Sequence, residues 1–291
     1  MIARAAAFAL AGLLAGACSG TSVEPRALLL ALRPDMPVAG EVGPAYYPGD
    51  EVEHLDSPAF RVHFTRAGRH AVPAGDRDRD GIPDYVQDVA DEYEAVRAYY
   101  RDDLGFLEPL SDARAPRAEG GDGGDSRFDV YLVDFGTSSD GAFRAQTCEP
   151  GAAHRCSGYM LQENDFDGRN YPSLDLATRI LASHEYFHAV QAAYRSDAGA
   201  VLGEGTAVWA SEAYDPSLDD FEGFASGYLA RTERSLTTEP TGPVDAFTYG
   251  SALFFQFLSE RHEPAIIREL WQALADQPTW PEASKSCDCG T

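Results

Sequence analysis

The sequence HEYFH occupies residues 184–188, inside a longer run, SLDLATRILASHEYFHAVQAAY (173–194), that contains neither glycine nor proline. The serine that opens this run is a favourable helix N-cap, so the run predicts one long helix. Residues four apart share a face of a helix, and His184 and His188 can therefore direct two imidazoles at one metal ion. Glu185 would lie beside that ion, where a carboxylate can take a proton from a water that the metal polarises.

A second short motif, GEGTAVW (203–209), supplies a candidate for a third protein ligand. Catalytic zinc sites use three protein ligands and keep the fourth position open for water or substrate. Glu204 is the best candidate, near the start of a predicted helix that runs to about Tyr214. Glu212 is the alternative, because eight residues place the two carboxylates roughly on one face. We expect Glu212 to be an outer partner of a ligating histidine instead.

Together these two motifs resemble the gluzincin metallopeptidases, whose aminopeptidase branch carries an N-E-G-F-A stretch that contains the third zinc ligand. The spacer between the motifs, 189–203, is 15 residues long and is shorter than in that branch. The chain is more similar to a family of bacterial exported HExxH metalloproteases. This resemblance covers roughly residues 58–275, and the blocks that carry it are, in order, FRVHF (60–64), the Asp-rich stretch from Asp76, FDVYL (128–132), GYM (158–160), NDF (164–166), the HEYFH helix, EGTA (204–207) and Tyr249-Gly250.

The resemblance implies an α+β fold, a zincin-like metalloprotease domain. A twisted sheet would pack on the HExxH helix, the C-terminal part would be mostly helical, and an edge strand near that helix would hold an extended substrate. The resemblance also implies a tyrosine that donates to the oxyanion of the tetrahedral intermediate, and Tyr249 is in a similar position. A buried or helix-capping tyrosine is an equally good interpretation of Tyr249, and His262 is a weaker rival for the same role.

The composition limits the class of protein. The chain has 291 residues, of which 44% are hydrophobic, and this is enough for one large domain or two small ones. A formal net charge of -24 argues against a nucleic-acid partner and against adhesion to anionic lipid. No stretch after residue 20 is long and apolar enough to span a bilayer, so any membrane contact would come through an N-terminal lipid anchor.

The first residues, 1–17, have the features of a signal peptide: one positive charge at Arg4, a short apolar run and an Ala-x-Ala ending. That ending suits ordinary signal peptidase. Small residues directly before Cys18 also resemble a bacterial lipobox, whose cysteine becomes lipidated. We favour lipidation, because a single N-terminal cysteine in an exported protein needs an explanation. The predicted location is therefore an outer-membrane or cell-surface lipoprotein, otherwise a periplasmic or secreted protein.

The remaining chain divides by composition. Residues 18–58 are rich in Gly, Pro and Glu and predict a lipid-proximal tether or a short pro-segment. Residues 59–276 carry the periodic elements and all the motifs of the predicted catalytic domain. Residues 277–291 predict an irregular tail.

An Asp-rich stretch, DRDRDGIPD (76–84), matches the pattern of a calcium-binding loop. Carboxylates alternate along it and a glycine at the sixth position allows the sharp turn. The twelfth position is Gln87 instead of the usual bidentate glutamate. An acidic loop that simply precedes a helix is the alternative. The predicted calcium ligands, with a structural role, are the side chains of Asp76, Asp78, Asp80 and Asp84 and the carbonyl of Ile82.

Two of the five cysteines flank a short polar loop. Cys148 and Cys156 predict a disulfide, because disulfides persist in the oxidising compartments that exported proteins reach.

The predicted function is that of an exported zinc metallopeptidase. Zn2+ would be held by His184, His188 and Glu204, and Glu185 would act as general base on a peptide or protein substrate. Two other functions stay open. One is a catalytically inactive, calcium-stabilised surface lipoprotein that binds a partner, and the other is a zinc hydrolase of a non-peptide substrate. Glu185 favours an enzyme, since a binding protein has no need of it.

Overall fold

The structure is a computed structural model that describes residues 33–35, 45–46, 49–113, 115, 121–136, 139–149 and 152–277. The predicted signal peptide 1–17, Cys18 and all but the first residue of the predicted tail 277–291 lie outside the described residues.

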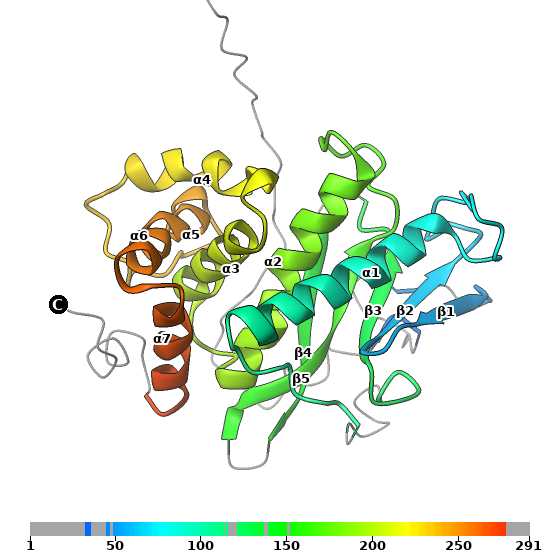
Figure 1. The fold of residues 1–291 in the computed structure, drawn as a ribbon, viewed down its shortest axis with the longest axis horizontal. Helices are drawn as coiled ribbons and strands as arrows, with labels where there is room; N and C mark the ends of the chain where they lie inside the picture. Colours follow the sequence, from blue (N-terminus) through cyan, green and yellow to red (C-terminus); the bar gives the residue numbers. More distant parts are fainter. Residues whose placement is uncertain are drawn as a thin grey trace, which may run out of the picture.

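A five-stranded open sheet forms the centre of the fold, in the order β1-β2-β3-β5-β4 (Figure 1). The inner strands β2, β3 and β5 run parallel to one another, whereas β1 and β4 are antiparallel to their single neighbours and lie at the two edges. The strands are β1 Val52–Asp56, β2 Phe60–Thr65, β3 Phe128–Val133, β4 Gly141–Glu149 and β5 Ala152–Glu163.

One face of this sheet is covered by two helices, α1 Asp84–Ala98 and α2 Leu174–Tyr194, which cross in front of the strands (Figure 1). Alternate side chains of a strand point to opposite faces, and the apolar set of the inner strands points to the helices. Val62, Val130 and Met160, for example, are fully buried in the same core as α1 and α2. The inner strands and the helices α1 and α2 therefore share one core.

The C-terminal part is helical and packs beyond α2, on the side away from β1 (Figure 1). A π-helical turn, Tyr99–Asp103, extends α1. No helix in the described ranges is long and apolar enough to cross a membrane. The helices of this part are α3 Ala200–Tyr214, α4 Asp220–Leu229, α5 Ala246–Gly250, α6 Ala252–His262 and α7 Ala265–Ala275. The architecture is thus mixed α+β, with the helix-rich C-terminal part that the sequence predicts.

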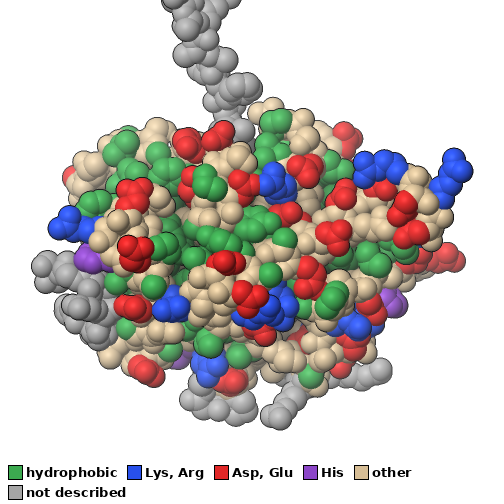
Figure 2. Space-filling model, viewed as in Figure 1, with side chains coloured by type: hydrophobic (Ala, Val, Ile, Leu, Met, Phe, Trp, Pro, Cys, Tyr) green, Lys and Arg blue, Asp and Glu red, His purple; other side chains and the backbone are tan. Residues whose placement is uncertain are grey.

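The excess of negative charge is spread over the surface and does not gather at one place on the face seen in Figure 2. Asp and Glu side chains are scattered over this face, and Lys and Arg side chains lie among them (Figure 2). Many arginines of the described chain pair with neighbouring carboxylates, as Arg66 does with Glu53.

The folded unit begins earlier than the predicted boundary at residue 59. The stretch 18–58, predicted as a tether, ends in the edge strand β1, which pairs with β2 over its whole length. Earlier residues of the same stretch are also buried, since Arg33 is 1% exposed and Tyr46 is 3% exposed. This prediction was wrong for the described part of the stretch. Its Gly- and Pro-rich composition gives no sign that the side chains of Arg33 and Tyr46 are buried against the sheet.

Arg33 lies on the face of the sheet opposite to α1 and α2. Its guanidinium pairs with the buried carboxylates of Asp112 and Asp129. It also donates to Gln146 Oε1 at 3.0 Å and to the carbonyl of Gly121 at 3.1 Å. A guanidinium has five donors in a fixed fork, so one arginine can satisfy several acceptors that would otherwise be buried without a partner. Arg33 therefore neutralises two carboxylates that the fold removes from water.

Replacement of Arg33 by leucine should destabilise the protein in a pH-dependent way. Burial raises the pKa of Asp112 to about 7, although the charge of Arg33 acts against this increase. A carboxyl whose pKa is higher in the folded state stabilises the fold at acid pH, and this contribution is lost as the pH rises through that pKa. Loss of Arg33 raises the pKa of Asp112 further, so the deficit grows with pH.

The measurement is urea unfolding of wild type and Arg33→Leu at pH 8 and pH 5. We expect a loss of about 3–5 kcal/mol at pH 8, the usual cost of leaving a buried charge unpaired, and a clearly smaller loss at pH 5. The control is Arg66→Leu, which removes an exposed arginine and should cost less than about 1 kcal/mol at either pH. Equal losses for the two variants at pH 8 would contradict the assignment.

Candidate metal centre

The helix α2 positions the two histidines. Its N-cap, Ser173, accepts a hydrogen bond from the backbone N–H of Leu176 at 3.1 Å, which satisfies one of the donors that a helix start leaves without a partner. His184 and His188 follow on one face, one turn apart, with ring centroids separated by 5.0 Å. The two imidazoles therefore lie close together on one face of α2.

The third group comes from the neighbouring helix α3. Glu204 is 3% exposed, and its Oε2 lies 3.1 Å from His184 Nε2 and 3.4 Å from His188 Nε2. Burial alone would raise the pKa of Glu204, but the two histidines outweigh burial and hold it well below its usual range. Burial likewise disfavours a charged His188, but the Glu204 carboxylate outweighs it and raises the pKa of His188 to about 9. The Glu204 carboxylate therefore contacts both imidazoles.

These distances fit a zinc ion. Two ligands that each lie about 2.0–2.1 Å from a tetrahedral metal are roughly 3.3 Å apart, which matches the two separations around Glu204 Oε2. Two imidazole nitrogens and one carboxylate oxygen are also a donor set that zinc accepts. Glu212 is two turns further along α3, about 12 Å at the usual rise per residue, so it does not reach the same point.

The residue after Glu204 must be glycine for this arrangement to form. A Cβ atom on Gly205 would collide with Ser251 Oγ and would lie 2.7 Å from the ring of Phe255. These atoms belong to the start of α6, which packs directly against α3. The Glu-Gly pair of the second motif therefore combines a ligand candidate with the close helix contact that holds it in place.

Glu185 lies on the side of the centre that faces the sheet edge. Its Oε2 accepts a hydrogen bond from the backbone N–H of Phe143 at 3.1 Å. Phe143 belongs to β4, which has a strand neighbour on one side only among the described residues. An oxygen of Glu185 lies within 4.8 Å of a nitrogen of each of the two histidines. The carboxylate thus lies between the candidate metal position and an open edge of the sheet.

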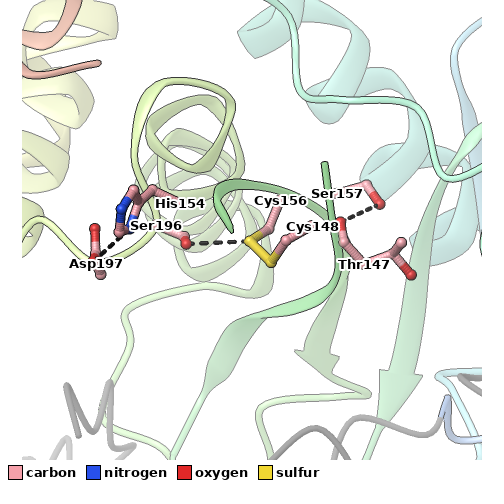
Figure 3. The surroundings of a disulfide bond; sticks show 7 residues. All are labelled: Thr147, Cys148, His154, Cys156, Ser157, Ser196 and Asp197. Atoms are coloured by element: carbon pink, nitrogen blue, oxygen red, sulfur yellow. Dashed lines mark hydrogen bonds and ion pairs between the residues drawn. A yellow bond between two sulfur atoms is a disulfide. The ribbon is translucent and has the colours of Figure 1, made fainter. Parts of the chain in front are cut away.

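A disulfide fixes the far end of this edge strand. Cys148 of β4 and Cys156 of β5 are direct partners in the sheet and are bonded to each other (Figure 3). Around it, Cys156 Sγ contacts Ser196 Oγ at 3.2 Å and His154 pairs with Asp197 at 2.7 Å (Figure 3). Ser196 and Asp197 follow the end of α2. The disulfide therefore links β4 to β5, and the contacts of Cys156 and His154 link β5 to the residues that follow α2.

Tyr249 of α5 lies beside the centre. It is 8% exposed, and its ring centroid is 6.1 Å from that of His184. On its other side it stacks on Phe224 of α4 at 4.8 Å. Asp245 caps α5 by accepting from Thr248 N at 3.0 Å. No contact joins His262 to the centre in the described part of the chain, so Tyr249 is the better placed of the two residues predicted for the oxyanion.

The Asp-rich loop brings together three of its five predicted ligands. Oxygens of Asp76, Asp78 and Asp80 lie within 4.8 Å of one another, and Gly81 adopts φ +93° at the turn. Asp84 instead begins α1 and accepts a hydrogen bond from Arg77 N at 3.1 Å. The backbone N–H of Ile82 donates to Asp80 Oδ1 at 2.8 Å, and the role of its carbonyl stays a prediction.

Three features of the site were not predicted from the sequence. β4 has a weak pattern of small and polar residues and no apolar alternation, so neither the strand nor its contact with Glu185 was found. Gln191 and Thr206, which bond to each other at 3.0 Å beneath His188, carry no motif of their own. The only sequence signal for Gln191 and Thr206 was the presence of a polar residue on the apolar side of a predicted helix.

Comparison with known families, curated proteins and solved structures finds no match to this chain. The resemblance to exported HExxH metalloproteases therefore stays an expectation, and the chemistry of the site rests on its own geometry.

Zinc binding distinguishes Glu204 from Glu212 as the third ligand. Glu204→Gln should weaken zinc binding by more than the 10- to 100-fold typical of outer-shell changes, because it removes a charged ligand. Glu212→Gln should change it much less. The measurement is competition of the metal-free protein with a chromogenic chelator. The reverse ranking of the two variants would assign Glu212 as the ligand.

Proposed function

We propose that this chain is an exported zinc-dependent metallopeptidase with a zincin-like active site. One observation supports the proposal above the others. The buried carboxylate of Glu204, which belongs to α3, lies 3.1 and 3.4 Å from the two imidazoles of the HEYFH helix α2. Two imidazoles and a carboxylate from two helices, with a further carboxylate beside them, are the parts that hydrolysis by an activated water needs.

Zinc, when bound, lowers the pKa of a water toward neutrality and polarises the carbonyl of the substrate. His184, His188 and Glu204 would hold it. Glu185 removes the proton from the attacking water and returns it to the leaving amine as the peptide bond breaks. The backbone N–H of Phe143, which donates to Glu185 Oε2, would hold this carboxylate in one orientation.

The substrate would extend along β4. An edge strand offers a row of backbone donors and acceptors, and an extended peptide can pair with them as an added strand. β4 is the edge nearest the histidine helix, and Phe143 N–H, which bonds to Glu185, belongs to it. A peptide paired with other backbone groups of β4 would therefore pass close to the general base, since the Phe143 N–H itself donates to Glu185. This geometry favours an extended peptide or protein over a compact small substrate.

The proposed location is outside the cytoplasm, with a lipid anchor at Cys18. The signal-like segment 1–17 supports export. The Cys148–Cys156 disulfide is compatible with an oxidising compartment.

We also propose a structural calcium ion in the Asp-rich loop. The oxygens of Asp76, Asp78 and Asp80 converge just before the start of α1, and three carboxylates at this spacing repel one another without a cation. Asp76 Oδ1 is buried and has no hydrogen-bond partner among the described residues, so it is available as a ligand. The ion would fix the entry into α1, which packs on the sheet.

Cleavage of a mixed peptide library by the zinc-loaded protein tests the main proposal. Wild type should cut, and Glu185→Gln should retain zinc and lose activity by about 100- to 10,000-fold, the usual contribution of a general base. Mass spectrometry of the products gives the cut sites. If wild type binds zinc and cuts no peptide, the peptidase is excluded, and a non-peptide hydrolase or an inactive partner-binding lipoprotein takes its place.

Substitution of Tyr249 by phenylalanine tests the oxyanion role. Loss of one oxyanion donor usually lowers kcat about 100- to 1,000-fold, and KM should change little because the donor acts in the transition state. A buried tyrosine with only a packing role would leave kcat within a few-fold of wild type. The control is Tyr228→Phe, a tyrosine of α4 that stacks on Phe247.

Calcium dependence of stability tests the loop. With zinc kept constant, calcium at 100 times its dissociation constant should stabilise the EGTA-treated protein by about 2.7 kcal/mol, seen as a higher midpoint of thermal unfolding. Asp78→Asn combined with Asp80→Asn should abolish this increase. Asp167→Asn, in a separate acidic loop, should preserve it. A midpoint that does not respond to calcium in wild type would exclude the site.

A further inference from the structure

Gln191 lies one turn after His188 on α2 and connects the candidate metal centre to the core. It is 5% exposed, and its side-chain amide makes three hydrogen bonds. Oε1 lies 2.8 Å from His188 Nδ1, and Nε2 lies 2.8 Å from the carbonyl oxygen of Gly203 and 3.0 Å from Thr206 Oγ1. Both hydrogens of the amide nitrogen and the amide oxygen are thereby used.

The orientation of this amide is determined by its partners. The carbonyl oxygen of Gly203 can only accept, so the atom that faces it must be the nitrogen of Gln191. The atom that faces His188 is then the amide oxygen, which can only accept. His188 Nδ1 must therefore carry a hydrogen. The nitrogen left for a metal ion is Nε2, the one that lies 3.4 Å from Glu204 Oε2.

Thr206 and Trp271 hold Gln191 in turn. The hydroxyl of Thr206 donates to the carbonyl of Leu202 at 2.8 Å, so it must accept from Gln191. It also accepts from the indole N–H of Trp271 at 3.2 Å, and an indole N–H can only donate. Thr206 and Trp271 are 0% and 1% exposed. Trp271 belongs to α7, so a chain of directed hydrogen bonds runs from the C-terminal helix to the ring of His188.

We propose that Gln191 is a positioning residue of the metal centre, with Thr206 and Trp271 as its supports. It fixes the rotation of the His188 ring and the nitrogen that the ring presents to the metal. This inference rests on the proposed zinc site and assigns a role to residues outside the two motifs. A histidine whose other nitrogen has a fixed hydrogen-bond partner is a better oriented metal ligand, and loss of such a partner usually weakens metal binding.

The zinc affinity of the metal-free protein tests the inference without any assay of catalysis. Gln191→Leu removes the acceptor and should weaken zinc binding about 10- to 100-fold. Thr206→Val and Trp271→Phe leave the acceptor in place and should give smaller losses, in that order. The matched control is Thr178→Val, which removes a buried hydroxyl of the same helix that donates to the Leu174 carbonyl. This control should stay within about twofold of wild type.

A double-mutant cycle separates positioning from general loosening of the core. If Gln191 acts through His188, Gln191→Leu should have no further effect on zinc affinity in a His188→Ala background. All affinities are measured well below the unfolding midpoint of each metal-free variant. Thr206→Val and Trp271→Phe keep the inference testable should Gln191→Leu fail to fold.

Two results would overturn the inference. One is a zinc affinity of Gln191→Leu within about twofold of wild type, and the other is an equal loss in the presence and absence of His188. The peptidase proposal is tested separately. Zinc binding that depends on Gln191 in a protein that cuts no peptide would retain the inference and exclude the peptidase. Peptide cleavage by a protein whose zinc affinity does not depend on Gln191 would retain the peptidase and overturn the inference. A wild-type protein that binds no zinc would overturn both.

Discussion

A carboxylate buried between two imidazoles is the interaction on which the rest of this molecule depends. Glu204 is 3% exposed, and a charge removed from water is costly unless charged or hydrogen-bonded partners replace the lost hydration. Those partners come from α2, so α2 and α3 must pack with their polar groups aligned. Gly205 permits the approach of α6 that holds α3 there, and Gln191 bonds across to the Gly203 carbonyl of α3. The helices are thus arranged around one polar point inside an apolar core.

The two faces of the sheet contribute to this point in different ways. The helix-covered face supplies the apolar surface on which α2 packs, and the opposite face holds Arg33 between buried carboxylates. Gln146, which accepts from Arg33, belongs to β4, the strand whose Phe143 N–H bonds to Glu185. Arg33 therefore contacts β4 on one face of the sheet, and the same strand contacts the candidate general base Glu185 through Phe143. The disulfide fixes the same strand at its other end.

The hydrogen-bond network beneath His188 links regions that have separate positions in the sequence. Trp271 lies near the end of the described chain, yet its indole N–H is two hydrogen bonds away from the amide that orients a candidate ligand. The Gly203 and Leu202 carbonyls can only accept and the Trp271 indole N–H can only donate, so these groups determine the direction of each hydrogen bond in the network. A buried polar network that is fully satisfied in this way specifies its geometry more strictly than apolar packing does. The helix α7 is therefore connected to the candidate metal centre by hydrogen bonds.

The sequence by itself determined the features that depend on local periodicity. The spacing of His184 and His188 places both on one helix face, and the run 173–194, free of glycine and proline, predicts the helix that forms as α2. The sequence ranked Glu204 above Glu212 as the third ligand, but only the tertiary structure showed that Glu204 contacts both histidines. The tertiary structure alone revealed β4 as the edge beside Glu185, 42 residues away, and the burial of Arg33, 96 residues from Asp129. Contacts between distant residues depend on how whole elements pack, and no short stretch of sequence carries that information.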